Sequence, residues 1–144
     1  MKIKSFKANK LIRDQVPNIL RARGIVVYER VMEKEEFIQK LKDKLLEEAK
    51  EVGQAQNIEE LLEELADVVE VIQTLSSATG LTMEEIEKMR IKKRQLKGGF
   101  EEKIFNSHID INEDNPEIAY YLNKPTQYPQ INHETHQSDC VRLL

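Results

Sequence analysis

The spacing of apolar residues along the middle of this chain predicts two long α-helices that face each other. At 3.6 residues per turn, the first helix gathers an apolar stripe of Leu41, Leu45 and Val52, with Phe37, Ile38 and Ala55 at its edges. The second helix carries a matching stripe of Leu61, Leu65, Val68, Ile72 and Leu75. A short break at residues 53–57 then predicts an antiparallel hairpin.

Capping residues indicate where these helices and a third one begin and end. Asn57 is expected to be the N-cap of the second helix, with Glu60 at the capping-box position, and Gly80 ends that helix. Thr82 and Glu85 form the same pattern before the third helix, which stops at the glycines after Lys97. We therefore expect helices over about 34–55, 58–79 and 83–97.

The flanking segments give weaker patterns. Residues 1–9 are compatible with a short strand or an extended arm, and Asp14 is expected to cap a short helix that includes Pro17 and stops at Gly24. Residues 25–31 are rich in β-branched side chains and predict a short strand or an extended segment. The predicted fold is an all-α bundle built on the helix hairpin, with a short extended N-terminal segment and an irregular C-terminal tail.

Composition places the chain among folded proteins of one main domain. Of its 144 residues, 40% are hydrophobic and 33% are charged. No run of about 18 apolar residues and no apolar signal core is present, so neither a membrane span nor secretion is expected. A single cysteine, Cys140, excludes an intrachain disulfide. These features favour the cytoplasm.

Charge divides the chain at about residue 105. Residues 106–144 carry six acidic and two basic side chains, which leaves 20 of each sign in residues 1–105. The net charge of −4 therefore belongs to the tail, and no clustered positive excess of the kind that binds nucleic acid is present. We expect one main domain over 1–105 and a polar extension over 106–144.

Two acidic pairs with equal spacing lie on the predicted hairpin. Glu48 and Glu51 are three residues apart, as are Glu64 and Asp67, and twelve residues separate the pairs. Each pair lies on one side of its helix, so the hairpin can direct four carboxylates at one point. Such an oxygen-only set suits a hard divalent cation.

The position of Glu48 indicates that this cluster is more than a solvated surface. Glu48 falls within the apolar stripe of the first helix, whereas Glu64 lies at the edge of the second stripe. A buried carboxylate costs several kcal/mol, roughly, unless it is protonated or meets a cation. A metal ion would supply that partner.

Basic residues on the third helix suggest a place for anionic groups. Arg90, Lys93, Arg94 and Lys97 follow i, i+3, i+4, i+7 spacing, and a flexible pair of glycines follows them. Beside a metal site, such a stripe could hold the phosphates of a nucleotide; its alternative is a solvated outer face. Lys10 and Arg13 are open to both interpretations, as phosphate ligands or as ion-pair partners of nearby acids.

Histidine and cysteine offer a weaker alternative. His133, His136 and Cys140 have metal-ligand spacing but lack a fourth ligand. No histidine lies within residues 1–105, so the body of the chain provides no histidine base.

The acidic pattern resembles a known superfamily. Glu48-x-x-Glu51 followed after twelve residues by Glu64-x-x-Asp67 is similar to the metal-binding pattern of the all-α nucleoside triphosphate pyrophosphatases. The flanking sequences KLIRDQVP and KGGFEEKIF resemble the MazG-like, phosphoribosyl-ATP pyrophosphohydrolase-like branch. The resemblance covers residues 8–105.

The resemblance implies an α-helical bundle that forms homodimers or larger oligomers. It implies cleavage between the α- and β-phosphates of a nucleotide, with Mg²⁺ (or Mn²⁺) as cofactor and the clearing of non-canonical nucleotides as the role. The implied metal ligands are Glu48, Glu51, Glu64 and Asp67. Glu47 stands where the family often has a further acidic residue, which gives Glu47 and Glu48 as catalytic candidates.

Two classes of function remain open at this point. The first is a metal-dependent nucleotide pyrophosphatase with substrate contacts from Lys10, Arg13, Lys93, Arg94 and Lys97. The second is a non-catalytic helical oligomer that binds a nucleotide or a protein partner. Pyrophosphate release from a panel of triphosphates distinguishes the two.

Overall fold

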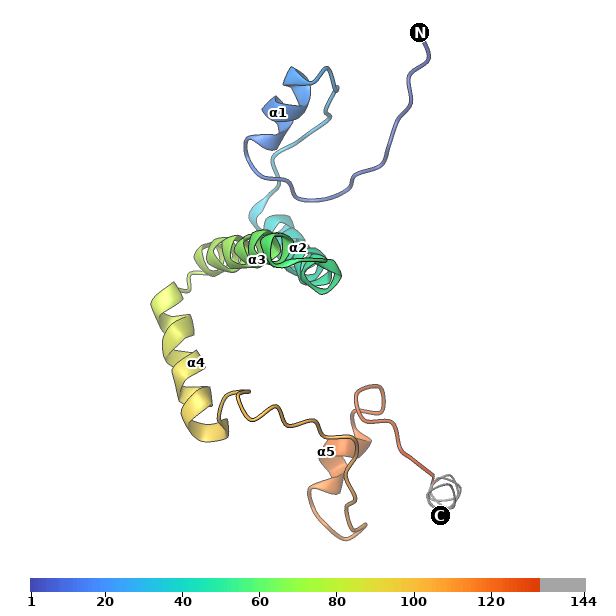
Figure 1. The fold of residues 1–144 in the computed structure, drawn as a ribbon, viewed down its shortest axis with the longest axis vertical. Coiled ribbons are helices and arrows are strands. Elements are labelled where there is room, and N and C mark those ends of the chain that lie inside the picture. Colours follow the sequence, from blue (N-terminus) through green and yellow to red (C-terminus); the bar gives the residue numbers. More distant parts are fainter. Residues whose placement is uncertain (133–144) are drawn as a thin grey trace. The chain divides into compact units, whose positions relative to one another are not determined.

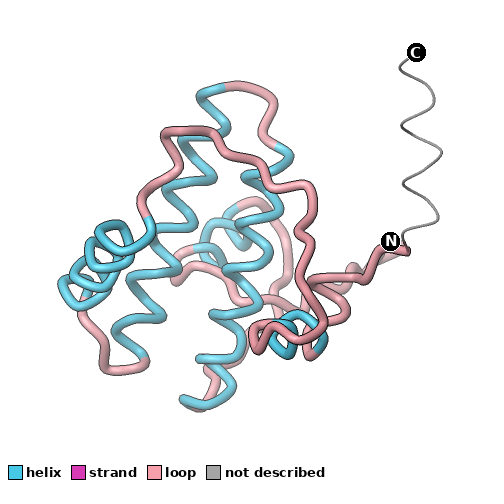
Figure 2. The backbone as a smooth tube through the Cα atoms, turned by 90° about the horizontal axis from the view of Figure 1, so that it is seen from below, coloured by secondary structure: helices cyan, strands magenta, loops and turns pink. Residues whose placement is uncertain are grey.

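The computed structural model describes residues 1–132, and every regular element among them is a helix (Figures 1 and 2). The chain divides into two compact units, Met1–Gly99 and Phe100–Leu144. The predicted all-α class is confirmed. None of the described helices is long and apolar enough to span a bilayer.

The first unit is built on the hairpin of α2 (Lys34–Gln54) and α3 (Ile58–Ala78), which pack along their lengths (Figure 2). Three residues join the two helices. The Asn57 side chain accepts the Glu60 amide at 2.9 Å, as an N-cap should. The Glu60 carboxylate, however, accepts the amide of Gln56 at 2.8 Å, one residue before the position that a capping box requires. The predicted hairpin is confirmed with this small change.

The hairpin encloses few side chains completely. Among the described apolar residues, Leu41 and Val71 are buried, at 2% and 7% exposure, and they come from the two facing helices. Leu65, a member of the predicted apolar stripe of α3, is 45% exposed. The apolar arc of α3 is wider than one neighbouring helix can cover, so its outer edge remains open.

A tight turn leads from α3 to α4 (Met83–Lys97). Gly80 adopts φ +79°, a left-handed conformation that favours glycine, and the amide of Leu81 returns to the Ser76 carbonyl at 2.9 Å. The buried Ser76 hydroxyl donates to the Leu81 carbonyl at 2.7 Å. The capping box of Thr82 and Glu85 forms as predicted.

Before the hairpin lies α1 (Val16–Ala22), with Pro17 in its first turn. Its N-cap is Gln15, without a side-chain hydrogen bond, so the expectation that Asp14 caps it is wrong. Residues 25–33 are extended rather than part of a strand. Ion pairs of Arg21 with Glu29 and of Arg30 with Glu36 connect that extended segment to α1 and to α2.

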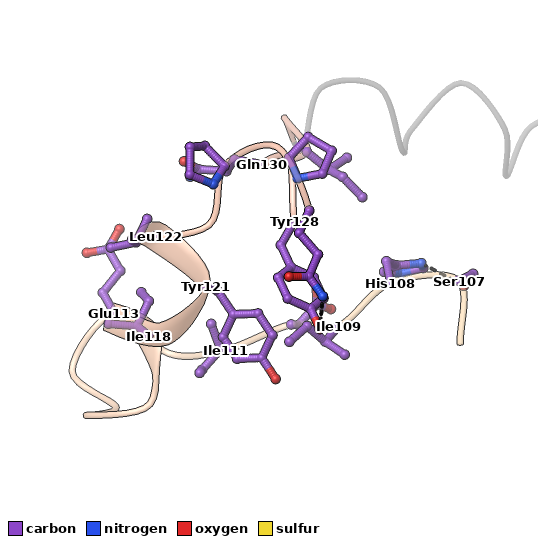
Figure 3. A pocket seen from close by; sticks show the side chains of 15 residues that line it. Ser107, His108, Ile109, Ile111, Glu113, Ile118, Tyr121, Leu122, Tyr128 and Gln130 are labelled. Atoms are coloured by element: carbon purple, nitrogen blue, oxygen red, sulfur yellow. Dashed lines mark hydrogen bonds between the residues drawn. The ribbon is translucent and has the colours of Figure 1, made fainter. Parts of the chain in front are cut away.

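In the described part of the second unit, residues 100–132, the short helix α5 (Ile118–Leu122) is followed by a turn that packs Tyr128 against it. The rings of Tyr121 and Tyr128 lie 4.9 Å apart, edge to face, and Tyr120 lies beside them. The rings of Tyr121 and Tyr128 and nearby isoleucines border an open hollow (Figure 3). The tail aromatics thus contact one another within their own unit.

Candidate metal centre

Three of the four predicted metal ligands meet on one side of the hairpin. One carboxylate oxygen from each of Glu48, Glu51 and Glu64 lies within 4.8 Å of the other two. Oxygens around an octahedral Mg²⁺ at about 2.1 Å are about 3.0–4.2 Å apart. Small side-chain rotations would therefore close the group around such an ion.

Burial increases from the rim of this group toward its centre. Glu51 is exposed and Glu64 is half-buried, whereas Glu48 is 5% exposed. Two oxygens in the group, Oε2 of Glu48 and Oε2 of Glu64, are buried without a hydrogen-bond partner. Buried acceptors of this kind normally have a partner, so their position fits a bound cation.

The surroundings of Glu48 raise the pKa of its carboxyl group. Burial is the main cause, and the nearby carboxylate of Glu51 adds to the effect through charge repulsion. Lys44 opposes the shift from one turn earlier on α2, with its Nζ 2.9 Å from Oε1 of Glu48. Glu48 therefore has one oxygen on a lysine and one oxygen without a partner.

Glu47 lies beside this group and has two cationic partners. Its Oε1 accepts Nζ of Lys44 at 3.1 Å and Nζ of Lys10 at 3.3 Å. Burial favours the protonated form, but the two lysines outweigh it and lower the pKa of Glu47. Glu47 is therefore ionised at neutral pH.

The fourth predicted ligand, Asp67, is not within the group of three. Its Oδ1 accepts the guanidinium of Arg13 at 2.5 Å. Lys10 and Arg13 thus bring the segment before α1 onto the acidic hairpin, one contacting each helix. The sequence left two roles open for these residues, as phosphate ligands or as ion-pair partners of nearby acids. In the structure both form ion pairs, and their partners belong to the hairpin.

The predicted phosphate ligands on α4 are on an exposed surface. Lys93, Arg94 and Lys97 all lie on a helix that buries no residue. In the same stripe, Arg90 pairs with Glu87 of its own helix at 2.6 Å. The structure does not bring this stripe into the carboxylate group.

Sequence reasoning missed Lys44. The signal was present, because Lys44 stands three and four residues before Glu47 and Glu48, the spacing at which helical side chains meet. The hollow of the second unit contains none of the predicted site residues. His133, His136 and Cys140 lie outside the described residues.

Comparison with known proteins identifies one family. The family model for phosphoribosyl-ATP pyrophosphohydrolase matches residues 20–94, just over half of the 144-residue chain. The matched range includes all four acidic ligand candidates and Lys44, but begins after Lys10 and Arg13. No curated protein and no solved structure shows significant similarity to the chain.

Proposed function

Because the chain belongs to the phosphoribosyl-ATP pyrophosphohydrolase family, and that family supports an activity of the nucleotide pyrophosphohydrolase type, we propose that it is a divalent-metal-dependent enzyme. It cleaves the bond between the α- and β-phosphates of a nucleoside triphosphate or related nucleotide. The products are the monophosphate and pyrophosphate. The catalytic domain spans residues 1–105, with residues 106–144 as a polar extension.

The observation that carries this proposal is the unpartnered Oε2 of Glu48. It is buried, and its carboxylate lies beside those of Glu51 and Glu64. A carboxylate so placed is costly unless a cation joins it. All the donors are oxygens, which favours Mg²⁺ or Mn²⁺ over softer metals.

Four carboxylates would hold the ion: those of Glu48, Glu51, Glu64 and Asp67. Asp67 stands three residues after Glu64 on α3, and its Oδ1 contacts Arg13. When bound, a divalent ion neutralises phosphate oxygens and lowers the pKa of a bound water.

Glu47 and Glu48 are the proposed catalytic residues. Phosphoanhydride cleavage requires an aligned water and charge neutralisation more than covalent chemistry. The lowered pKa keeps Glu47 ionised, so its carboxylate can orient a water and accept its proton. Glu48 would help to hold the ion, which would supply charge neutralisation at the reacting phosphate.

Cationic side chains would bind the remaining phosphates. Lys10 and Arg13 are the best-supported ligands, because each already reaches an acidic residue of the hairpin. We also retain Lys93, Arg94 and Lys97 on α4 in this role. Contacts of Arg and Lys with phosphate oxygens are charge-assisted hydrogen bonds, which are among the stronger ones in proteins.

A homodimer or larger homo-oligomer is part of the proposal. Four apolar residues of α3 follow i, i+4, i+7, i+11 spacing and are 45–74% exposed: Ile58, Leu62, Leu65 and Val69. A second copy that buries this stripe would complete the bundle, and twofold symmetry is the commonest arrangement. We further propose a cytoplasmic role in removing non-canonical nucleotides, with no nucleic-acid or membrane partner.

The test is the release of pyrophosphate from a substrate panel. Canonical, deoxy and base-modified triphosphates are incubated with Mg²⁺ or Mn²⁺, alongside phosphoribosyl-ATP. We expect monophosphate and pyrophosphate from at least one substrate, and no reaction in excess EDTA. Absence of pyrophosphate with every substrate and both metals would instead favour the non-catalytic binding function.

A further inference from the structure

Lys44 occupies an unusual position for a lysine. Its side chain is 16% exposed, although lysine ammonium groups normally remain in water. The ammonium lies 2.9 Å from Oε1 of Glu48 and 3.1 Å from Oε1 of Glu47. It is therefore held by two carboxylates of the same helix, at the inner edge of the acidic group.

The other cations near the site differ from Lys44 in burial and in origin. Lys10 and Arg13 are 49% and 56% exposed, and they precede α1 in the chain. They pair with Glu47 and Asp67, which are outside the group of three carboxylates. Among the ion pairs described for residues 1–132, Lys44 alone supplies a cation to Glu48.

A cation in this position has two opposite effects on the site. It stabilises the protein without metal, because a buried Glu48 with no counter-charge would be strongly destabilising. It also repels a divalent ion that approaches the free oxygen of the same carboxylate. At separations of a few ångströms such repulsion remains substantial, even near a protein surface.

We propose that Lys44 is a resident counter-ion of the acidic site, which stabilises the metal-free protein and thereby limits the affinity of the site for free divalent metal. This inference rests on the metal site of the proposed function. It assigns to Lys44 a regulatory role that acts through Glu48, without contact to metal or nucleotide.

The test compares Mn²⁺ binding by the full-length wild type and the variant Lys44→Met. Methionine keeps most of the side-chain volume and removes the charge. Titration calorimetry on EDTA-treated protein should give a dissociation constant for Mn²⁺ that is lower in Lys44→Met by about five- to tenfold. Without metal, the same variant should have a lower melting temperature than wild type, and Mn²⁺ should raise that temperature by more.

Two control variants separate the contact from general effects of charge. Lys44→Arg keeps a cation beside Glu48 and should bind Mn²⁺ like wild type. Lys40→Met removes the same charge one turn earlier on α2, where Lys40 lies 3.8 Å from Asp43 and away from Glu48. This control should also leave Mn²⁺ affinity within about twofold, since one exposed charge has little effect.

The outcomes distinguish this inference from the proposed function. Wild type that binds Mn²⁺, together with Lys44→Met that binds equally or more weakly, overturns the counter-ion role alone. Wild type that neither binds Mn²⁺ nor gains thermal stability from it overturns the metal site and this inference with it. If Lys44→Met does not fold, Lys44→Gln replaces it, with the same expected sign and the same criterion.

Discussion

The hairpin of α2 and α3 and the helix α4 are all rich in charge, yet they differ in what their charges contact. Helix α4 has the more complete local signals, with a full capping box at Thr82, whereas α2 has no side-chain cap. Nevertheless, α4 buries no residue, and α2 and α3 pack on each other. Caps determine where a helix begins, but a wide apolar arc determines whether it is buried.

The same contrast applies to the ion pairs. On α4, the described pairs Lys88–Glu84 and Arg90–Glu87 are local and exposed, so they contribute little to stability. On the hairpin, Lys44 and Glu48 form a pair of low exposure in which one carboxylate oxygen still lacks a partner. Only this second environment makes a bound cation energetically valuable.

The most damaging change should be Glu48→Gln. It keeps the shape of the side chain but removes the charge that a divalent ion requires, so kcat should fall by at least about a thousandfold. Circular dichroism should show a folded protein. Steady-state pyrophosphate release in Mg²⁺ provides the measurement.

The matched control is Glu84→Gln, the same substitution on α4. Glu84 is 78% exposed and forms an ion pair with Lys88 of its own helix. This variant should keep wild-type kcat. Near wild-type turnover in Glu48→Gln would remove Glu48 from the site.

The second effect concerns the uncovered face of α3. Leu62→Lys introduces a charge into the exposed stripe without disturbing the monomer, since Leu62 is 68% exposed. If that stripe is buried between two copies, the dissociation constant of the dimer should rise by roughly tenfold to a hundredfold. Sedimentation across a range of concentrations measures it.

A neighbouring substitution provides the control for charge. Glu63→Lys makes a larger change in charge at an exposed position on another side of α3, and it should leave the dimer intact. A wild type that sediments at 16.8 kDa at micromolar concentration contradicts the dimer itself.

The third effect compares the two groups of cations. Arg13→Gln removes a guanidinium that already reaches Asp67, and KM for the preferred triphosphate should rise about ten- to a hundredfold, which corresponds to about 1.5–3 kcal/mol. Arg94→Gln should have a similar effect if the α4 stripe binds phosphate. Arg90→Gln is the control, because Arg90 pairs with Glu87 and is not a proposed ligand.

The kinetic outcomes show whether the phosphates of the substrate bind to the segment before α1, to α4 or to both. A rise in KM for Arg13→Gln alone would restrict phosphate binding to the segment before α1. If KM and kcat were unchanged in single variants at Lys10, Arg13, Arg94 and Lys97, these cations would have a structural role and would not bind the phosphates.

How much of the structure could be predicted from the sequence depends on how far apart in the chain the interacting residues lie. Helix ends at Asn57, Thr82 and Gly98 depend on neighbours within four residues, and they were predicted correctly. The burial of Glu48 was predicted from its position within the apolar stripe of the first helix. The pairing of Arg13 with Asp67 joins residues 54 positions apart, so no local pattern could reveal it.

The exposure of Leu65 shows a second limit of sequence patterns. Periodicity identifies an apolar arc, but the width that is covered depends on how many helices pack against it. One neighbouring helix covers the side of α3 that bears Val71 and leaves Leu65 45% exposed. The apolar pattern therefore predicted the hairpin correctly, but it could not determine which residues of the stripe the single chain covers.

The smallest effect concerns the pH dependence of stability without metal. The pKa of Glu48 is raised from its ordinary value of 4.5, mainly by burial, so the folded state holds this proton more tightly than the unfolded state does. The free energy of unfolding should therefore fall as pH rises from about 4.5 through the raised pKa. The lowered pKa of Glu47 acts in the opposite direction, in a window below 4.5.

Urea unfolding in EDTA at a series of pH values above 4.5 measures this effect, with Glu48→Gln as the reference. The amide does not titrate, so the variant should lack the fall in stability that wild type shows over the same pH range. Saturating Mn²⁺ should also abolish the fall in wild type, because the bound ion keeps Glu48 ionised and offsets its burial. If the free energy of unfolding changed with pH in the same way for wild type and Glu48→Gln in EDTA, titration of Glu48 would not be the cause of the fall in stability.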